Sequence, residues 1–173
     1  MSARVKAAKA AKAVGAATAA ALLLMATGAC SGGDGGGNAG QAADASTRLP
    51  VTITGAGGSH VFLVERAVTA AQQAQGLMYR TDLTPDGGML FHPYPAGGGA
   101  PREASFWMKN TPTPLDILFI RADGTIATIA ENTVPYATTE VKSREPVAAV
   151  LEIVGGRAAE LGIAEGDRVT WAK

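Results

Sequence analysis

The chain has 173 residues, of which 47% are hydrophobic and 17% are charged, and its basic and acidic residues are equal in number. This length is enough for one domain. Four of the fifteen basic residues lie within residues 1–12, and the rest of the chain has no basic stripe of the kind that binds nucleic acid, so we expect no nucleic-acid partner.

The N-terminal segment, residues 1–29, resembles the signal peptide of a bacterial lipoprotein. Residues 1–12 contain four basic residues and no acidic one, and residues 14–26 form an apolar run of thirteen residues, too short to span a bilayer. Two small residues then precede Cys30, where such a signal places its lipid acceptor, although Thr27 stands where the motif usually has an aliphatic residue. The alternative is ordinary cleavage just before the cysteine, which would leave a free thiol.

Lipidation of Cys30 predicts an exported protein that is anchored in a membrane and faces the periplasm. Ser31 rather than aspartate follows the cysteine, which favours the outer membrane if the host has two membranes. Residues 30–48 predict a flexible tether, because glycine, alanine and small polar residues have little to bury. Removal of residues 1–29 takes away basic charges only, and lipidation leaves no thiol for a disulfide, for catalysis or for a metal.

The remaining residues, 49–173, predict one monomeric domain that is built mainly of short strands. A short helix begins at Thr69, which forms a capping box with Gln72, and ends at Gly76. A second helical turn follows the last buried strand, and the loops between strands are irregular. The fold class is therefore mainly β, a small antiparallel β-sandwich or barrel-like domain with one or two short helices. The predicted strands are 50–54, 60–68, 87–93, 105–109, 115–121, 125–130, 147–156 and 166–173.

Six segments occur along this domain in a recognisable order. They are GLMYR (76–80), GGMLF (87–91), FWMKNTPTPLDILFI (106–120), ADGTIATI (122–129), VLEIVGG (150–156) and LGIAEGDRV (161–169). Together they resemble the bacterial and archaeal family called domain of unknown function 192. The resemblance covers nearly all of residues 50–172 and implies a small, mainly β domain that is often exported. It carries over no biochemical activity.

Residues that could perform catalysis or bind a metal are few. No Ser-His-acid set can be singled out, and HExxH, CxxC and EF-hand motifs are missing, so we expect no catalytic residue and no cofactor. A weaker alternative is a Cu(I) site built from thioethers, with Met78, Met89, Met108 and His92 as the ligands. Methionine more often fills gaps in a core, and Met89 and His92 fall on opposite faces of a strand.

Asp116 is the sharpest anomaly, because both faces of the strand LDILFI are otherwise apolar. A carboxylate in that position must be paired or hydrogen-bonded. The candidate partners are the Arg80 guanidinium, the Asn110 amide, the Thr111 hydroxyl and the backbone of the Thr-Pro loop. Asp116 then either clamps this corner of the fold or faces a ligand together with Arg80.

Trp107 lies on the more polar face of its strand, with Ser105 and Lys109 and away from Phe106 and Met108. A large aromatic side chain in such a position often lines a groove, and a polar, ring-shaped or glycan-like ligand would suit it. The alternative is that Trp107 caps the end of the core.

These features predict an envelope protein that binds a small polar ligand or another envelope protein and is not an enzyme. One alternative is an enzyme of envelope glycans that uses Asp116 with Glu152 or Glu103. Another is a purely structural or assembly accessory with an exposed apolar patch. The predicted ligand-binding residues are Arg80, Trp107, Lys109, Asn110, Thr111 and Asp116.

Overall fold

The computed structural model describes residues 48–172, so the predicted signal segment, Cys30 and most of the tether lie outside the described residues. None of the helices in the described part has the length and hydropathy needed to cross a membrane. The strands and helices in chain order are β1 (Leu49–Gly55), β2 (Gly58–Ala67), α1 (Ala70–Gln75), β3 (Gly87–Phe91), β4 (Arg102–Phe106), β5 (Leu115–Ile120), β6 (Ile126–Ala130), β7 (Val141–Val147), β8 (Ala149–Val154), α2 (Arg157–Leu161) and β9 (Arg168–Trp171).

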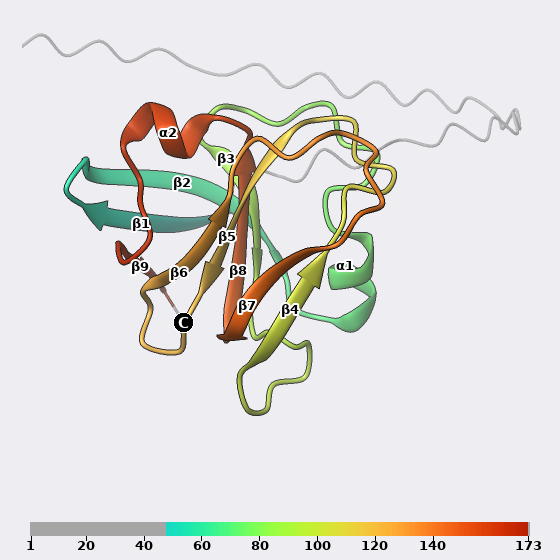
Figure 1. Ribbon diagram of the computed structural model, residues 1–173, viewed down its shortest axis with the longest axis horizontal. Coiled ribbons are helices and arrows are strands. Elements are labelled where there is room, and N and C mark those ends of the chain that lie inside the picture. Colours follow the sequence, from blue (N-terminus) through green and yellow to red (C-terminus); the bar gives the residue numbers. More distant parts are fainter. Residues whose placement is uncertain (1–47, 173) are drawn as a thin grey trace, which may run out of the picture. The chain divides into compact units, whose positions relative to one another are not determined.

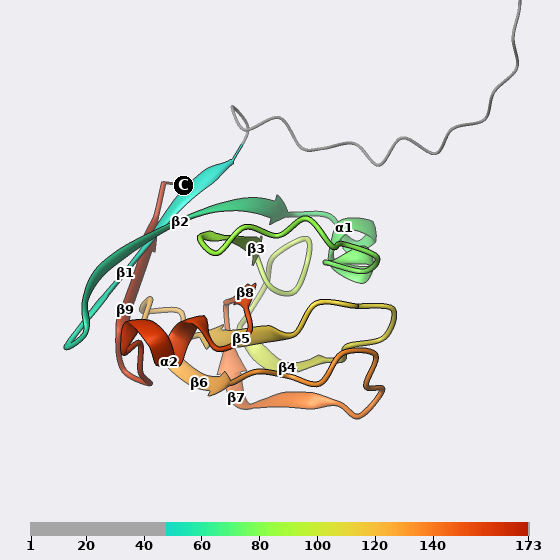
Figure 2. The same cartoon turned by 90° about the horizontal axis from the view of Figure 1, so that it is seen from above.

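Seven strands form one curled sheet in the order β6-β5-β8-β3-β2-β1-β9 (Figures 1 and 2). This confirms a mainly β, barrel-like fold with two short helices. The expectation of purely antiparallel pairing is wrong at one position, because β2 and β3 run parallel. Parallel neighbours need a crossover of a dozen or more residues, and residues 68–86, which include α1, provide it.

Strand β7 was not expected, because residues 131–146 were predicted to be irregular. Its sequence, VKSREPV, alternates only weakly, and it exists through its antiparallel pairing with β4 in a separate two-stranded ribbon. The buried Ser143 supports this pairing by accepting a hydrogen bond from the backbone N–H of Ala104 at 2.9 Å. Strand β4 itself begins and ends three residues earlier than the predicted strand 105–109.

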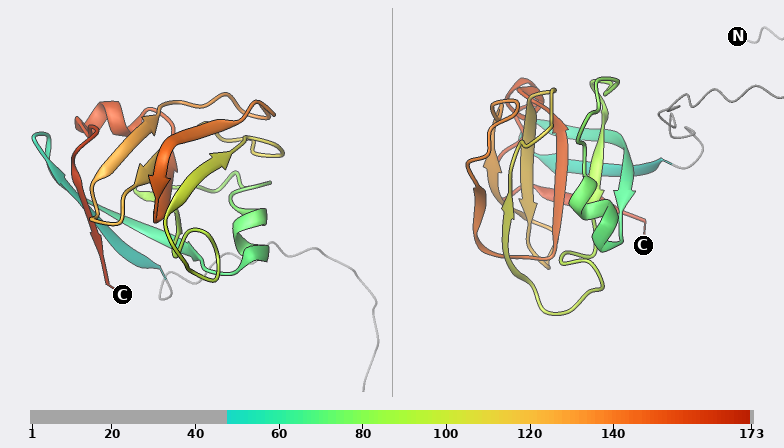
Figure 3. Two further views of the ribbon diagram at one scale, coloured as in Figure 1. Left: turned by 60° about the horizontal axis from the view of Figure 1, so that its bottom comes forward. Right: turned by 90° about the vertical axis from the view of Figure 1, so that its right-hand side faces the viewer.

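Two apolar cores lie on opposite faces of the central strands. Since neighbouring side chains of a strand point to opposite faces, β8 contributes Leu151 and Ile153 to the first core and Val150 to the second. The first core lies against β1, β2, β9 and Ala158 of α2. The second core lies against the β4–β7 ribbon and the segment after α1, and Figure 3 shows β4 between β7 and α1.

Candidate functional site

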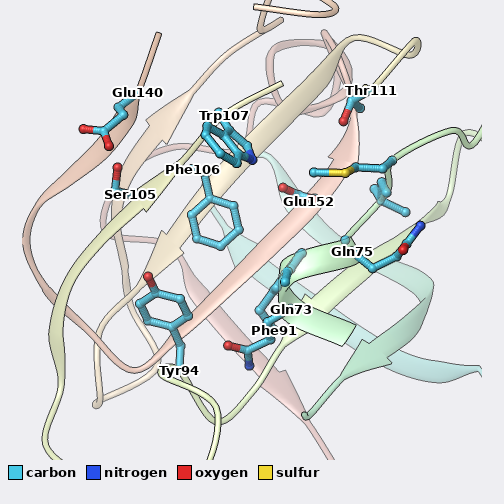
Figure 4. A pocket seen from close by; sticks show the side chains of 14 residues that line it. Gln73, Gln75, Phe91, Tyr94, Ser105, Phe106, Trp107, Thr111, Glu140 and Glu152 are labelled. Atoms are coloured by element: carbon cyan, nitrogen blue, oxygen red, sulfur yellow. The ribbon is translucent and has the colours of Figure 1, made fainter. Parts of the chain in front are cut away.

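A pocket of about 390 Å³ opens between α1 and β4, on the side of the sheet that carries the second core. In Figure 4 the rings of Tyr94, Phe106 and Trp107 lie along one side of it, the side chains of Gln73 and Gln75 lie along the other, and Glu152 lies between them. The residues that line the pocket are Gln73, Ala74, Gln75, Gly76, Leu77, Met78, Phe91, Tyr94, Ser105, Phe106, Trp107, Thr111, Glu140 and Glu152.

Glu152 is a buried carboxyl group on the central strand β8, with only 4% of the residue exposed. It stands opposite Met89 of β3 and Ile117 of β5, so its strand neighbours offer no partner. Within residues 48–172 no hydrogen bond or ion pair reaches its carboxylate, and burial alone raises its pKa to about 8. Strand β3 packs closely against β8 at this position, because a Cβ on Gly88 would lie 2.1 Å from the backbone carbonyl oxygen of Glu152.

The aromatic side of the pocket is a packed group of rings. Phe106 packs edge-to-face against Phe91, with 5.0 Å between the ring centroids, and lies 5.8 Å from the ring of Tyr94. Trp107, the next residue, is 48% exposed, and the Lys109 ammonium lies 5.3 Å from its ring centroid. The pocket therefore has a rigid aromatic wall with an accessible tryptophan at its edge.

The opposite side of the pocket is held by α1. The predicted capping box is present, with Thr69 and Gln72 bonded reciprocally, and Gly76 is the C-cap. The Gln73 amide donates to the carbonyls of Ala67 and Pro93 at 3.0 and 2.7 Å. Its oxygen accepts from the backbone N–H of Ala96, so one side chain ties α1 to the segment that carries Tyr94.

Two segments distant in sequence are joined beside the pocket. The Tyr79 N–H donates to the Asn110 carbonyl, and the Asn110 amide donates to the Tyr79 hydroxyl, both at 2.8 Å. The Thr113 hydroxyl donates to the Arg80 carbonyl at 3.0 Å. Tyr79, Asn110 and Tyr136 all have positive φ, at 64°, 57° and 60°. Left-handed backbone at non-glycine residues is costly and gathers at functional sites.

Among the described residues, Asp116 has three backbone partners and no side-chain partner. Its carboxylate accepts from the N–H groups of Asn132 at 2.6 Å, Gly156 at 2.9 Å and Ala158 at 2.7 Å. The expectation that Arg80, Asn110, Thr111 or the backbone of the Thr-Pro loop pairs with it is therefore wrong. Asp116 therefore has a structural role, but it holds the loop after β6 and the start of α2 and not the Thr-Pro corner that the clamp interpretation named.

Arg80 instead forms a bidentate ion pair with Glu65 at 2.9 and 3.0 Å and a further bond to Asp82 at 2.7 Å. These hydrogen bonds, with that of Glu65 the strongest, raise the pKa of Arg80. The predicted pairing of Arg80 with Asp116 is wrong because the two groups lie on opposite faces of the sheet. Glu65 shares its face of β2 with Ala67 of the second core, whereas Asp116 points to the face of the first core.

The structure brings only part of the predicted site together. Trp107 and Thr111 line the pocket, and Lys109 lies against Trp107. Asn110 contacts Tyr79, while Arg80 and Asp116 are not among the lining residues.

Glu152 was considered in the sequence only as a catalytic partner of Asp116, and that pairing is wrong. Glu152 stands opposite Ile117, the residue next to Asp116, so the two carboxylates point to opposite faces of the sheet. Glu103, the other candidate, is exposed on β4. The signal for Glu152 was the same as for Asp116, namely an acidic residue inside an apolar strand.

The methionines mostly act as packing groups. Met89 and Met108 belong to the second core, and Met108 sulfur accepts a hydrogen bond from Thr133 at 3.1 Å. His92 packs against the Trp171 ring, with centroids 5.1 Å apart. In the part of the chain that the structure describes, no group of three or more His, Cys, Asp or Glu residues could hold a metal ion.

The fold and the site define a small, mainly β domain with a partly open pocket that contains a buried carboxyl group. The chain belongs to the DUF192 family, described as uncharacterized ACR, whose model matches residues 51–171. No curated protein matches it.

Two solved structures are similar to this chain. A protein of unknown function from Novosphingobium aromaticivorans is 50% identical, with a TM-score of 0.66, over 71% of this chain and 85% of that one. A Sinorhizobium meliloti protein with the provisional name of a transcription regulator is 47% identical, with a TM-score of 0.66, over 72% of this chain and 93% of that one.

Proposed function

We propose that this protein is an exported, lipid-anchored binding module of the cell envelope that takes a small, ring-bearing polar ligand into the Glu152 pocket. Export and anchoring are supported by the basic and apolar N-terminal segments and by the position of Cys30. Binding is supported by the pocket, whose volume lies within the roughly 300–1,000 Å³ usual for small-molecule sites.

The observation that carries the proposal is the unpaired Glu152 inside this pocket. Its carboxyl oxygens are not among the fully enclosed atoms that lack a partner in the described residues, so they open into the pocket, where a ligand can reach them. Proteins keep buried polar groups without a partner rarely, and often where a ligand supplies the missing hydrogen bond. The aromatic wall beside Glu152 provides a surface on which a planar ring or the apolar face of a sugar can stack.

The binding test uses amide NMR spectra of the full chain titrated with a library of small fragments. We expect fragments to shift the amide signals of pocket residues and the affinity to fall at least tenfold in Trp107→Ala. The matched control is Tyr136→Ala, which removes an aromatic side chain that is 63% exposed and does not line the pocket. If no fragment shifts the pocket amides, or both variants lose binding equally, the proposed binding function is wrong.

Anchoring has a separate test. Cells that express the full chain are labelled with a radioactive or alkyne-bearing fatty acid, and we expect label on the wild type but not on Cys30→Ser. A wild-type protein without label would remove the anchoring part of the proposal and leave the binding part in place.

A further inference from the structure

We infer that the ligand of the Glu152 pocket is an organic cation, a primary ammonium or guanidinium group attached to a flat apolar body. This inference rests on the proposed function, since it names the ligand chemistry of the same site.

The charges around the pocket favour a cation. The charged side chains that line it are Glu152 and Glu140, and no lysine or arginine among residues 48–172 is a lining residue. An anionic ligand group would therefore approach two carboxyl groups with no compensating positive charge in the lining. A cationic group meets complementary charge.

The aromatic wall favours the same ligand class. The face of an aromatic ring attracts cations, and two rings of this wall already lie near side-chain cations. Arg102 lies 5.7 Å from the ring centroid of Tyr94, and Lys109 lies 5.3 Å from that of Trp107. Glu152 lines the same pocket as these rings, so a ligand whose body stacks on them can place an ammonium at Glu152, where a charge-assisted hydrogen bond supplies the missing partner.

Apart from the exposed Gln75, the polar side chains of α1 and of the Thr-Pro corner in the pocket lining already form hydrogen bonds within the fold. The Gln73 amide makes three hydrogen bonds within the fold. The Thr111 hydroxyl donates to the Lys109 carbonyl at 3.3 Å. Glu152 is thus the buried acceptor to which a ligand donor can bond.

Cation binding at this site is coupled to proton release. Burial raises the pKa of Glu152 to about 8, so the empty site holds a proton at neutral pH, and a bound cation displaces it. The other titratable lining groups are Tyr94 and Glu140, Arg102 and Lys109 lie near the rings, and the lining residues of α1 are uncharged. The affinity for a cation therefore falls as the pH is lowered from 8.

The test uses the full chain and three probes of one shape, namely benzylamine, benzyl alcohol and benzoate, titrated by amide NMR. We expect benzylamine to bind at least tenfold more tightly than either of the others at pH 8, and its affinity to fall about fiftyfold between pH 8 and pH 6. Calorimetry in two buffers of different ionisation enthalpy should show release of close to one proton at pH 7.

Two variants sharpen the test. Glu152→Gln should remove both the preference for the amine and the pH dependence, whereas Glu131→Gln, an exposed carboxylate outside the pocket lining, should keep both.

The outcomes separate the two proposals. If benzyl alcohol or benzoate shifts the pocket amides at least as strongly as benzylamine, or if benzylamine binds with no pH dependence, the cation is the wrong class and the binding function stands. If neither these probes nor the fragment library shifts those amides, the binding function and the cation inference both fail.

Discussion

Asp116 and Glu152 are two buried carboxyl groups on neighbouring central strands, with 0% and 4% of each residue exposed. They differ in their surroundings. Asp116, on the face of the first core, accepts three backbone hydrogen bonds. Glu152, on the face of the second core, has no partner among the described residues, and it lines a pocket.

This difference separates a structural carboxylate from one that is available for function. The hydrogen bonds of Asp116 satisfy its charge and hold the loop after β6 and the start of α2, so it has little capacity left for a ligand. The Glu152 carboxyl is left with a burial cost that the fold itself does not offset. An acidic residue in an apolar strand is thus not informative by itself, and its hydrogen-bond partners decide its role.

The largest expected effect comes from removing the structural carboxylate. Asp116→Ala should lower the free energy of unfolding by about 3–5 kcal/mol, because one buried and two partly buried N–H groups lose their acceptor. Urea denaturation at pH 7 measures this. Asp123→Ala is the control, since Asp123 is an exposed aspartate that also accepts a backbone hydrogen bond. Equal losses in the two variants would contradict the clamp role of Asp116.

The next effect is the pH dependence of stability that Glu152 should cause. Its pKa rises from 4.5 in the unfolded chain to about 8 in the fold, so the protonated folded state is favoured at low pH and this stability is lost as the pH rises toward 8. Relative to Glu152→Gln, the wild type should lose about 1.4 kcal/mol per pH unit between pH 5 and pH 8. Denaturation curves at four pH values measure the slope. Parallel stability curves for the two proteins would show that Glu152 ionises normally.

The smallest effect tests whether Arg80 belongs to the environment of Asp116. A double-mutant cycle of Arg80→Ala with Glu65→Gln should give a coupling energy of about 1 kcal/mol, because this ion pair is bidentate and only partly exposed. The cycle of Arg80→Ala with Asp116→Asn should give a coupling below about 0.5 kcal/mol. A larger coupling energy in the second cycle would mean that Arg80 and Asp116 interact although they lie on opposite faces of the sheet.

Local sequence signals predicted local structure well. The capping box of Thr69 and Gln72 and the stop at Gly76 are confirmed, because each depends on residues only a few positions apart. Strand β7 was missed because VKSREPV is held by pairing with β4, about forty residues earlier in the chain. The parallel β2–β3 pair was missed for the same reason, since strand neighbours are chosen by long-range packing.

The candidate site could be predicted only in part. Trp107 was selected because it lies on the more polar face of its predicted strand, and it lines the pocket. Tyr94, Gln73 and Glu152 come from three other segments, and nothing in the spacing of these residues indicates that they meet.

The sequence by itself determined that Asp116 and Glu152 are buried in central strands, because LDILFI and VLEIV are apolar on both faces. It also determined the family and the capped helix. Only the tertiary structure decided which of the two carboxylates receives hydrogen bonds from the fold. The register of β5 against β8 sends the two side chains to opposite faces, and the N–H groups that reach Asp116 come from residues 16 to 42 positions away. Pairing over such distances depends on the packing of the whole sheet, and no local pattern encodes it.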